Sequence, residues 1–262
     1  MHGTTRRCPC QQPPASLPRL PLHQVRKRWT RPARAYGGSR MTMTTVEPDL
    51  GSLYENVRQR VVAIAAGLGP DGLAVPVPAC PSWTVRDLLG HLIGVAEDAV
   101  AGRLTGPPDE AGTAAQVSAR RDTPLAALLD RWAVAGPAFA ERVRAGRVWP
   151  AVIDAVSHEH DLRGAIGRPG ERDSAEVQAV VPVLLRFTLP IPTVIQVGDD
   201  ALRLGPQGEP LLTLRTDAFE ALRWRMGRRS RRQMAAMCWT GDPSAVIEHL
   251  AVFGPAVDDI IE

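Results

Sequence analysis

The sequence predicts an α+β protein in which an N-terminal four-helix bundle is followed by a small α+β domain. Between residues 50 and 167, apolar residues recur at three- and four-residue steps in four segments, which is the period of amphipathic helices. After Gly170 the apolar segments become short and are separated by Gly, Asp and Pro, which indicates strands joined by turns. We therefore expect a bundle over residues 46–170 and a C-terminal domain over residues 171–262.

Capping and breaking residues bound the four expected helices. Thr84 and Asp87 have the spacing of a capping box in front of an apolar run, and Gly106-Pro107-Pro108 follows that run as a breaker. The expected helices are residues 50–68, residues 84–101, a segment that starts with Thr123 as its cap and is interrupted near Pro137, and residues 150–167.

The second domain begins with one further helix and continues with alternating apolar segments of strand length. A helix is expected over residues 175–187, and Thr216-Asp217 is expected to cap another that runs from Ala218 to about Met226. Short strands are expected at residues 193–197, 201–204 and 211–215.

The N-terminal segment differs in composition from the rest of the chain. Residues 1–40 contain eight Arg, one Lys and no acidic residue, a charge of +9, so the total of +3 leaves −6 for the remaining residues. With six prolines and no helical or strand period, residues 1–45 are expected to form a disordered basic tail. Met41 or Met43 is an alternative start of the chain. Nucleic-acid binding by this arm, through Trp29 and Tyr36, is an alternative that we do not favour.

Three polar residues on two of the expected helices form a candidate metal site. Asp154 and His158 are four residues apart, so their side chains share one helical face, and His91 lies two turns into another helix. Two imidazoles and one carboxylate leave a coordination position open, as in catalytic metal sites. Asp87 and Asp161 lie close enough in sequence to orient the second ring nitrogen of each histidine.

Local pattern alone also allows a simpler interpretation, because a histidine on a helix is more often a hydrogen-bonded core or surface residue than a ligand. His160 is about 200° around the helix from His158 at 3.6 residues per turn, so both cannot bind one ion. We expect His160 to be a partner or surface residue.

Two segments resemble the signature regions of a known family. Residues 77–92, Val-Pro-Ala-Cys-Pro-Ser-Trp-Thr-Val-Arg-Asp-Leu-Leu-Gly-His-Leu, and residues 158–167, His-Glu-His-Asp-Leu-Arg-Gly-Ala-Ile-Gly, are similar to the mycothiol-dependent maleylpyruvate isomerase family. Its N-terminal module belongs to the DinB/YfiT-like group of metal-binding four-helix bundles. The resemblance implies that His91, Asp154 and His158 are the metal ligands. The founding enzyme has Glu where this chain has Asp154, so the shorter side chain is expected to need a small helix shift or a water molecule to reach the metal.

The resemblance continues into the C-terminal domain. Residues 217–230 and 239–242 are similar to the domain of sterol-carrier-like fold that accompanies the bundle in this family. Arg228 matches a Gly-Arg position of the family, which suggests that it holds a substrate carboxylate. The alternative is that the arginines between Arg223 and Arg232 are a solvated basic face or a helix end.

The function expected from these features is thiol chemistry at a divalent metal, with zinc as the favoured ion and mycothiol as the thiol. The partners would be a small-molecule electrophile and this low-molecular-weight thiol, and the outcome would be isomerisation or S-transfer. A non-catalytic metal-binding scaffold or ligand-binding protein is the alternative. No run of about 18 apolar residues is present, and Cys80 and Cys238 lack a Cys-x-x-Cys pattern, as expected for a cytoplasmic protein. The predominance of Arg over Lys fits the actinobacterial setting that the family implies.

Overall fold

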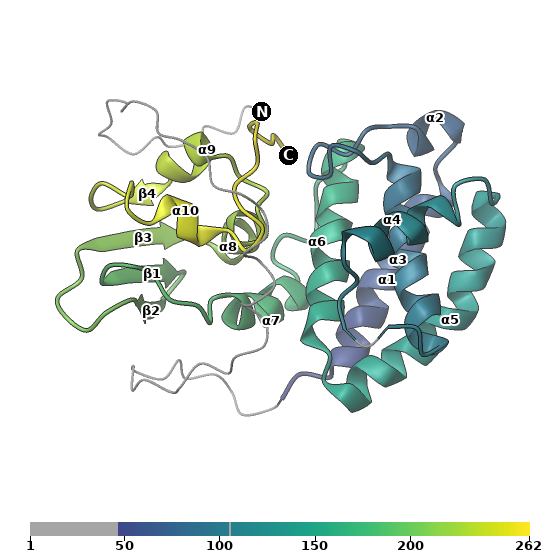
Figure 1. The fold of residues 1–262 in the computed structure, drawn as a ribbon, viewed down its shortest axis with the longest axis horizontal. Helices are drawn as coiled ribbons and strands as arrows, with labels where there is room; N and C mark the ends of the chain where they lie inside the picture. Colours follow the sequence, from purple (N-terminus) through teal and green to yellow (C-terminus); the bar gives the residue numbers. More distant parts are fainter. Residues whose placement is uncertain (1–46, 105) are drawn as a thin grey trace. The chain divides into compact units, whose positions relative to one another are not determined.

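The structure, a computed structural model, describes residues 47–104 and 106–262 (Figure 1). The expectations for residues 1–45 lie outside this range. The described chain forms two compact units, one of residues up to Leu185 together with Ile260–Glu262, and one of Arg186–Asp259. The predicted fold class, a helical bundle followed by a small α+β unit, is confirmed.

Four long helices build the first unit. Helix α1 packs against α5 and α6, and α3 packs against α5, α6 and the shorter α4. Within the described residues, no helix has the length and apolar character needed to cross a membrane. The helices of this unit are α1 (Leu50–Ala66), α2 (Pro70–Leu73), α3 (Val85–Val100), α4 (Glu110–Ser118), α5 (Leu125–Gly146), α6 (Trp149–Ala165) and α7 (Ala175–Leu184).

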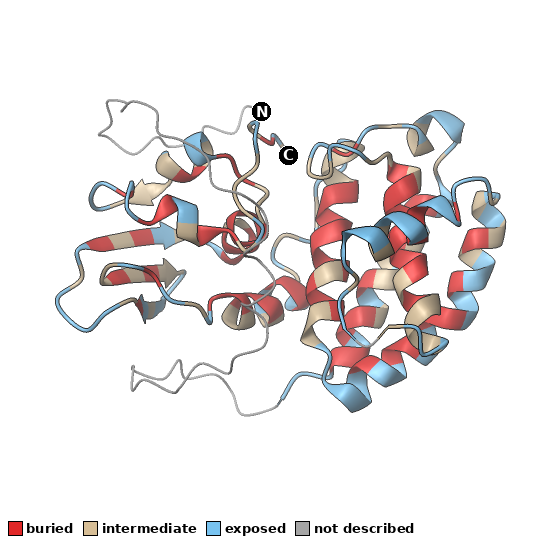
Figure 2. Ribbon diagram, in the orientation of Figure 1, coloured by how far each residue is buried: buried red, intermediate tan, exposed pale blue. Residues whose placement is uncertain are grey.

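The buried faces of these helices meet in one apolar core, which Figure 2 shows as inward-facing red segments on the long helices. Trp132 is buried, and its indole N–H donates to the hydroxyl of Tyr54 at 3.1 Å. Tyr54 in turn contacts the edge of Phe139, with ring centroids 5.0 Å apart. Each large apolar side chain buried in this way contributes about 1.5–3 kcal/mol, so tertiary packing dominates the stability of the bundle.

Helix α5 continues through Pro137, and the predicted interruption there is wrong. A proline inside a helix removes one backbone hydrogen bond and crowds the preceding turn. Here buried residues lie on both sides of it, with Leu128 and Trp132 before Pro137 and Phe139 and Val143 after it. Packing of both halves on the same core therefore outweighs the local cost of the proline.

Buried charges fix α7 to the bundle. Glu159 on α6 is 0% exposed and receives two hydrogen bonds of 2.8 Å from Arg60 on α1. Arg60 also pairs with Glu176 on α7 at 3.1 Å, and Arg163 donates to Glu159. The first compact unit therefore includes α7, and the units divide between Leu185 and Arg186.

The second unit contains a four-stranded mixed sheet in the order β2-β1-β3-β4. Strand β1 is antiparallel to β2 and parallel to β3, and Ile195 of β1 lies beside Leu214 of β3, both fully buried. The three longer strands lie within a residue of their expected positions. The elements of this unit are β1 (Thr193–Val197), β2 (Asp200–Leu204), β3 (Leu212–Thr216), α8 (Ala218–Arg225), α9 (Arg231–Ala235), β4 (Cys238–Trp239) and α10 (Ile247–Leu250).

Candidate metal centre

The start of α3 fixes the direction in which His91 points. Thr84 caps the helix by accepting from the backbone N–H of Asp87, and the Asp87 carboxylate accepts in return from the backbone N–H of Thr84. Burial alone would raise the pKa of Asp87, but the hydrogen bonds from Thr84 and the charge of Arg121 outweigh it and hold the pKa below its usual range. The predicted capping box is confirmed, and it sets the phase of α3 so that His91 lies on the buried face.

The structure brings His91 together with Asp154 and His158 of α6. The Nε2 atom of His91 is 3.5 Å from Oδ2 of Asp154, and Nε2 of His158 is 3.5 Å from Oδ1 of the same carboxylate. Both distances exceed those of good hydrogen bonds. They are close to the separation of about 3.3–3.4 Å between two ligand atoms that bind a tetrahedral zinc ion at 2.0–2.1 Å. The donor set and its spacing therefore fit a divalent ion.

Exposure differs among the three side chains. The imidazoles of His91 and His158 are buried, whereas the side chain of Asp154 is 35% exposed. Trp83, in the loop before α3, packs beside both imidazoles with its ring tilted to theirs, and its ring centroid is 5.1 Å from that of His91 and 5.6 Å from that of His158. The cluster is thus covered by protein around the histidines and reaches solvent at the aspartate.

Each histidine has a partner for its other ring nitrogen. Nδ1 of His158 is 3.0 Å from the buried carboxylate of Asp161, as predicted. For His91 the partner is Gln116 of α4, with Nδ1 and Oε1 3.0 Å apart. The prediction that Asp87 would orient His91 is wrong, because the carboxylate of Asp87 is used in the cap of α3.

Helix α4 was not expected from the sequence. Its segment, Glu-Ala-Gly-Thr-Ala-Ala-Gln-Val-Ser, has Val117 as its one large apolar residue, so it shows almost no apolar period. The sequence does contain one indication that another helix packs on α3, because Gly90 and Gly94 are one turn apart and leave space on its surface. A Cβ atom at Gly94 would lie 2.7 Å from Cβ of Gln116, so the small residue allows α4 to approach.

A second group of possible ligands shares His158. The Sγ atom of Cys80 lies 3.7 Å from Oδ2 of Asp161, next to Nδ1 of His158. Because Asp161 already orients His158, this cluster is best regarded as part of the surroundings of the first one. His160 is in neither group, and at 3% exposure it is buried, so of the two expected roles, partner or surface residue, only that of a partner residue remains.

Arg228 lies in the second unit, directly after α8. Gly227 before it has a φ of +79°, and a Cβ atom there would lie 2.5 Å from the carbonyl oxygen of Gly254, so the turn requires glycine. The Arg228 side chain is half-buried, and its Nη1 donates to the carbonyl oxygen of Met226 at 2.7 Å. Arg223 and Arg225 are buried, which excludes a fully solvated basic face for this run.

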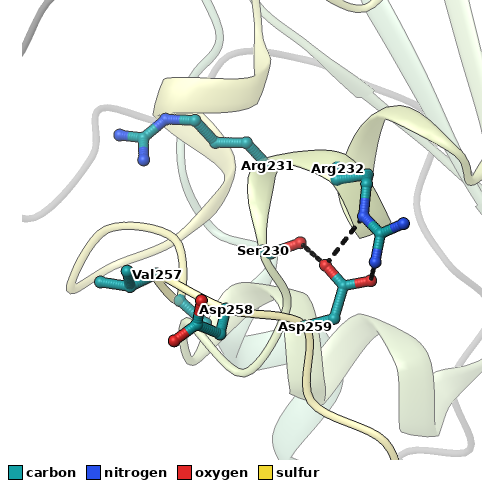
Figure 3. A pocket seen from close by; sticks show the side chains of 7 residues that line it. Ser230, Arg231, Arg232, Val257, Asp258 and Asp259 are labelled. Atoms are coloured by element: carbon teal, nitrogen blue, oxygen red, sulfur yellow. Dashed lines mark hydrogen bonds and ion pairs between the residues drawn. The ribbon is translucent and has the colours of Figure 1, made fainter.

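The same unit has a pocket of about 350 Å³ between the start of α9 and residues 256–259 (Figure 3). Three of its charged side chains are already compensated, because Asp259 accepts from Ser230 and from Arg232, and Arg231 pairs with Glu248. The pocket lacks the convergent histidines of the first unit, so the candidate site remains His91, Asp154 and His158.

Residues 54–166 match the family described as the mycothiol maleylpyruvate isomerase N-terminal domain. The matched segment is less than half of the chain, and it lies within the first unit. The family match extends from α1 to the end of α6, so it includes α4 with Gln116 and all three residues of the candidate metal centre. The resemblance stated from the sequence is confirmed.

Two solved structures are similar to the chain. A crystal structure of the mycothiol-dependent maleylpyruvate isomerase is 14% identical, with 69% of this chain and 88% of that chain covered and a TM-score of 0.47. A histidine-to-alanine mutant of the mycothiol-dependent maleylpyruvate isomerase is 12% identical, with the same coverage and a TM-score of 0.49. No curated protein matches.

Proposed function

We propose that the protein is a divalent-metal-dependent and mycothiol-dependent enzyme that activates a thiol for addition to an electrophile. The observation that carries the proposal is the convergence of His91, Asp154 and His158, whose donor atoms lie within 4.8 Å of one another inside a domain of the isomerase family. Two nitrogen donors and one oxygen donor favour zinc.

His91, His158 and Asp154 would have different roles at such a site. His91 and His158 would bind through Nε2, since their Nδ1 atoms face Gln116 and Asp161. Asp154 would supply the negative charge and, as the most exposed of the three, would lie where the thiol enters. The bound ion would lower the pKa of a coordinated thiol and hold it as thiolate near neutral pH.

The electrophile is a small molecule, and Arg228 is proposed to hold its carboxylate through charge-assisted hydrogen bonds. If the thiol adds to a carbon–carbon double bond and leaves again after rotation about the former double bond, the outcome is isomerisation. If the carbon–sulfur bond persists, the outcome is S-transfer. The cytoplasmic location expected from the sequence belongs to this proposal.

Metal analysis combined with thiol titration tests the proposal. The purified protein should contain about one divalent ion per chain, and mycothiol should release protons on binding, whereas glutathione should substitute poorly because it lacks the sugar–inositol body. Turnover of maleylpyruvate or of an activated aryl halide should require mycothiol.

Three alanine variants locate the ion. His91→Ala and His158→Ala should each abolish metal retention, and His160→Ala should retain most of it, because His160 is on the same helix but outside the cluster. Equal losses in the three variants would contradict the ligand assignment. Metal-replete protein that neither binds mycothiol nor shows thiol-dependent turnover would be a metal-binding scaffold and not an enzyme.

A further inference from the structure

We propose that Gln116 and Asp98 act as a positioning pair that fixes His91 in the tautomer whose Nε2 lone pair faces Asp154 and His158. The proposal rests on the proposed metal site, because it assigns two residues that prepare a ligand of that site. Asp98 follows His91 by seven residues on α3, and Gln116 comes from a different helix, α4, 25 residues after His91.

The direction of each hydrogen bond follows from the chemistry of Asp98. An ionised carboxylate only accepts, so the group that faces Asp98 must be the amide nitrogen of Gln116, which lies 2.9 Å from Oδ2. The amide oxygen then faces Nδ1 of His91 at 3.0 Å and can only accept. The proton of the neutral imidazole is therefore on Nδ1, and the lone pair is on Nε2.

The surroundings keep Asp98 ionised and in place. Arg103 donates to its Oδ1 from both Nε and Nη2, at 3.0 and 2.6 Å, and Nη2 of Arg120 lies 4.0 Å from the same oxygen. Burial alone would raise the pKa of Asp98, but the hydrogen bonds from Gln116 and Arg103 outweigh it and hold the pKa below its usual range. The ionised carboxylate of Asp98 prevents the side-chain amide of Gln116 from flipping, because a flip would place the amide oxygen against the carboxylate.

Helix packing places Gln116 at the required distance. Gln116 is 3% exposed, and its backbone carbonyl oxygen accepts from Nη1 of the buried Arg120. Arg120 in turn donates to Glu97 on α3. Gly94 provides the space for this contact between α3 and α4, because a Cβ atom there would lie 2.7 Å from Cβ of Gln116.

A device of this kind is needed because Asp154 favours the opposite tautomer. Its Oδ2 lies 3.5 Å from Nε2 of His91, so in the absence of a metal the carboxylate would attract a proton to Nε2. An imidazole protonated at Nε2 cannot bind an ion through that atom. The amide oxygen of Gln116, which Asp98 holds in place, accepts a hydrogen bond from Nδ1 and so keeps the proton there. Residues that orient a metal ligand in this way typically contribute 10–100-fold to metal affinity.

Substitutions at Gln116 in the full chain test the pair. Gln116→Met keeps the approximate length of the side chain but removes the acceptor, and the dissociation constant for zinc, measured by competition with a chelator, should rise about 10–100-fold. Gln116→Glu combined with Asp98→Asn reverses donor and acceptor between the two residues while retaining an acceptor for His91, so this double variant should bind zinc nearly as tightly as wild type. Gln59→Met, at an exposed glutamine of α1, is the matched control and should change nothing.

Ring-nitrogen chemical shifts of His91 in metal-free protein provide a readout that loss of stability alone would not produce. Wild type and the double variant should show the tautomer protonated at Nδ1, and Gln116→Met should show a larger share protonated at Nε2. Unchanged zinc affinity and unchanged tautomer in a folded Gln116→Met protein would overturn the proposal. If Gln116→Met fails to fold, weak zinc binding by the folded double variant would overturn it instead. Failure of the metal site itself is distinguishable, because wild type would then bind no zinc.

Discussion

Replacement of Glu159 by glutamine should destabilise the helical unit strongly. The carboxylate is 0% exposed and accepts two hydrogen bonds of 2.8 Å from Arg60 and two, of 3.0 and 2.9 Å, from Arg163. Glu159→Gln would leave two guanidinium ions beside a neutral amide. Loss of one member of a buried ion pair costs about 3–5 kcal/mol. Because Glu176 still accompanies Arg60, we expect a value of about 3 kcal/mol, at the lower end of that range.

Thermal unfolding measures this effect. For a unit of this size, 1 kcal/mol corresponds to about 3 °C, so the transition of the helical unit should fall by about 10 °C. Glu47→Ala is the matched control, because Glu47 pairs with Arg147 at 2.7 Å but both side chains are largely exposed, and such pairs contribute about 0–1 kcal/mol. The metal content of folded Glu159→Gln should be unchanged, since Glu159 contacts α1 and not the candidate metal centre. A decrease no larger than that of the control would refute the reasoning.

Three further outcomes are expected. Arg228→Ala should lower kcat/KM for carboxylate-bearing electrophiles by about one to two orders of magnitude, equivalent to about 1.5–3 kcal/mol, with metal content unchanged; an equal decrease for neutral electrophiles would contradict the assigned contact. Burial would raise the pKa of Glu176, but the hydrogen bonds that it accepts from Asn56 and Arg60 hold the pKa below its usual value of 4.5. The ionised carboxylate therefore stabilises the fold fully above pH 4.5, and this stabilisation is lost as the pH falls through the folded-state pKa. Glu176→Gln should lower the melting temperature at pH 7, and the melting temperature of this variant should decrease less steeply below pH 4.5 than that of wild type. Gly94→Ala should weaken zinc binding, measured by chelator competition, because the added Cβ atom would displace α4. This is expected even though alanine favours a helix over glycine by about 1 kcal/mol. Unchanged zinc affinity would show that α4 accommodates the methyl group.

Sequence reasoning succeeded where the structure depends on residues close together in the chain. The cap of α3 is made by residues three apart, and the contact between His158 and Asp161 is also made by residues three apart on one helix. Strand β1 was expected over the same residues that form it, because alternating apolar residues and flanking turns are local features.

The failures depend on contacts between distant residues. Pro137 was expected to interrupt α5, but burial of residues on both sides of it, which depends on α1 and α3, keeps the helix continuous. Gln116 was missed because it lies on a helix with little apolar period, and 25 residues separate it from His91.

The two histidines of the candidate metal centre therefore depend on different parts of the fold. His158 and its carboxylate partner Asp161 lie on one helix, so their contact forms whenever α6 forms. The acceptor for His91 is available only after α4 has packed on α3, which requires the space at Gly94. Perturbations that loosen α4 should consequently reduce the contribution of His91 to metal binding before that of His158. The zinc affinity of the candidate metal centre should therefore depend on the packing of α4, although α4 supplies none of the candidate ligands.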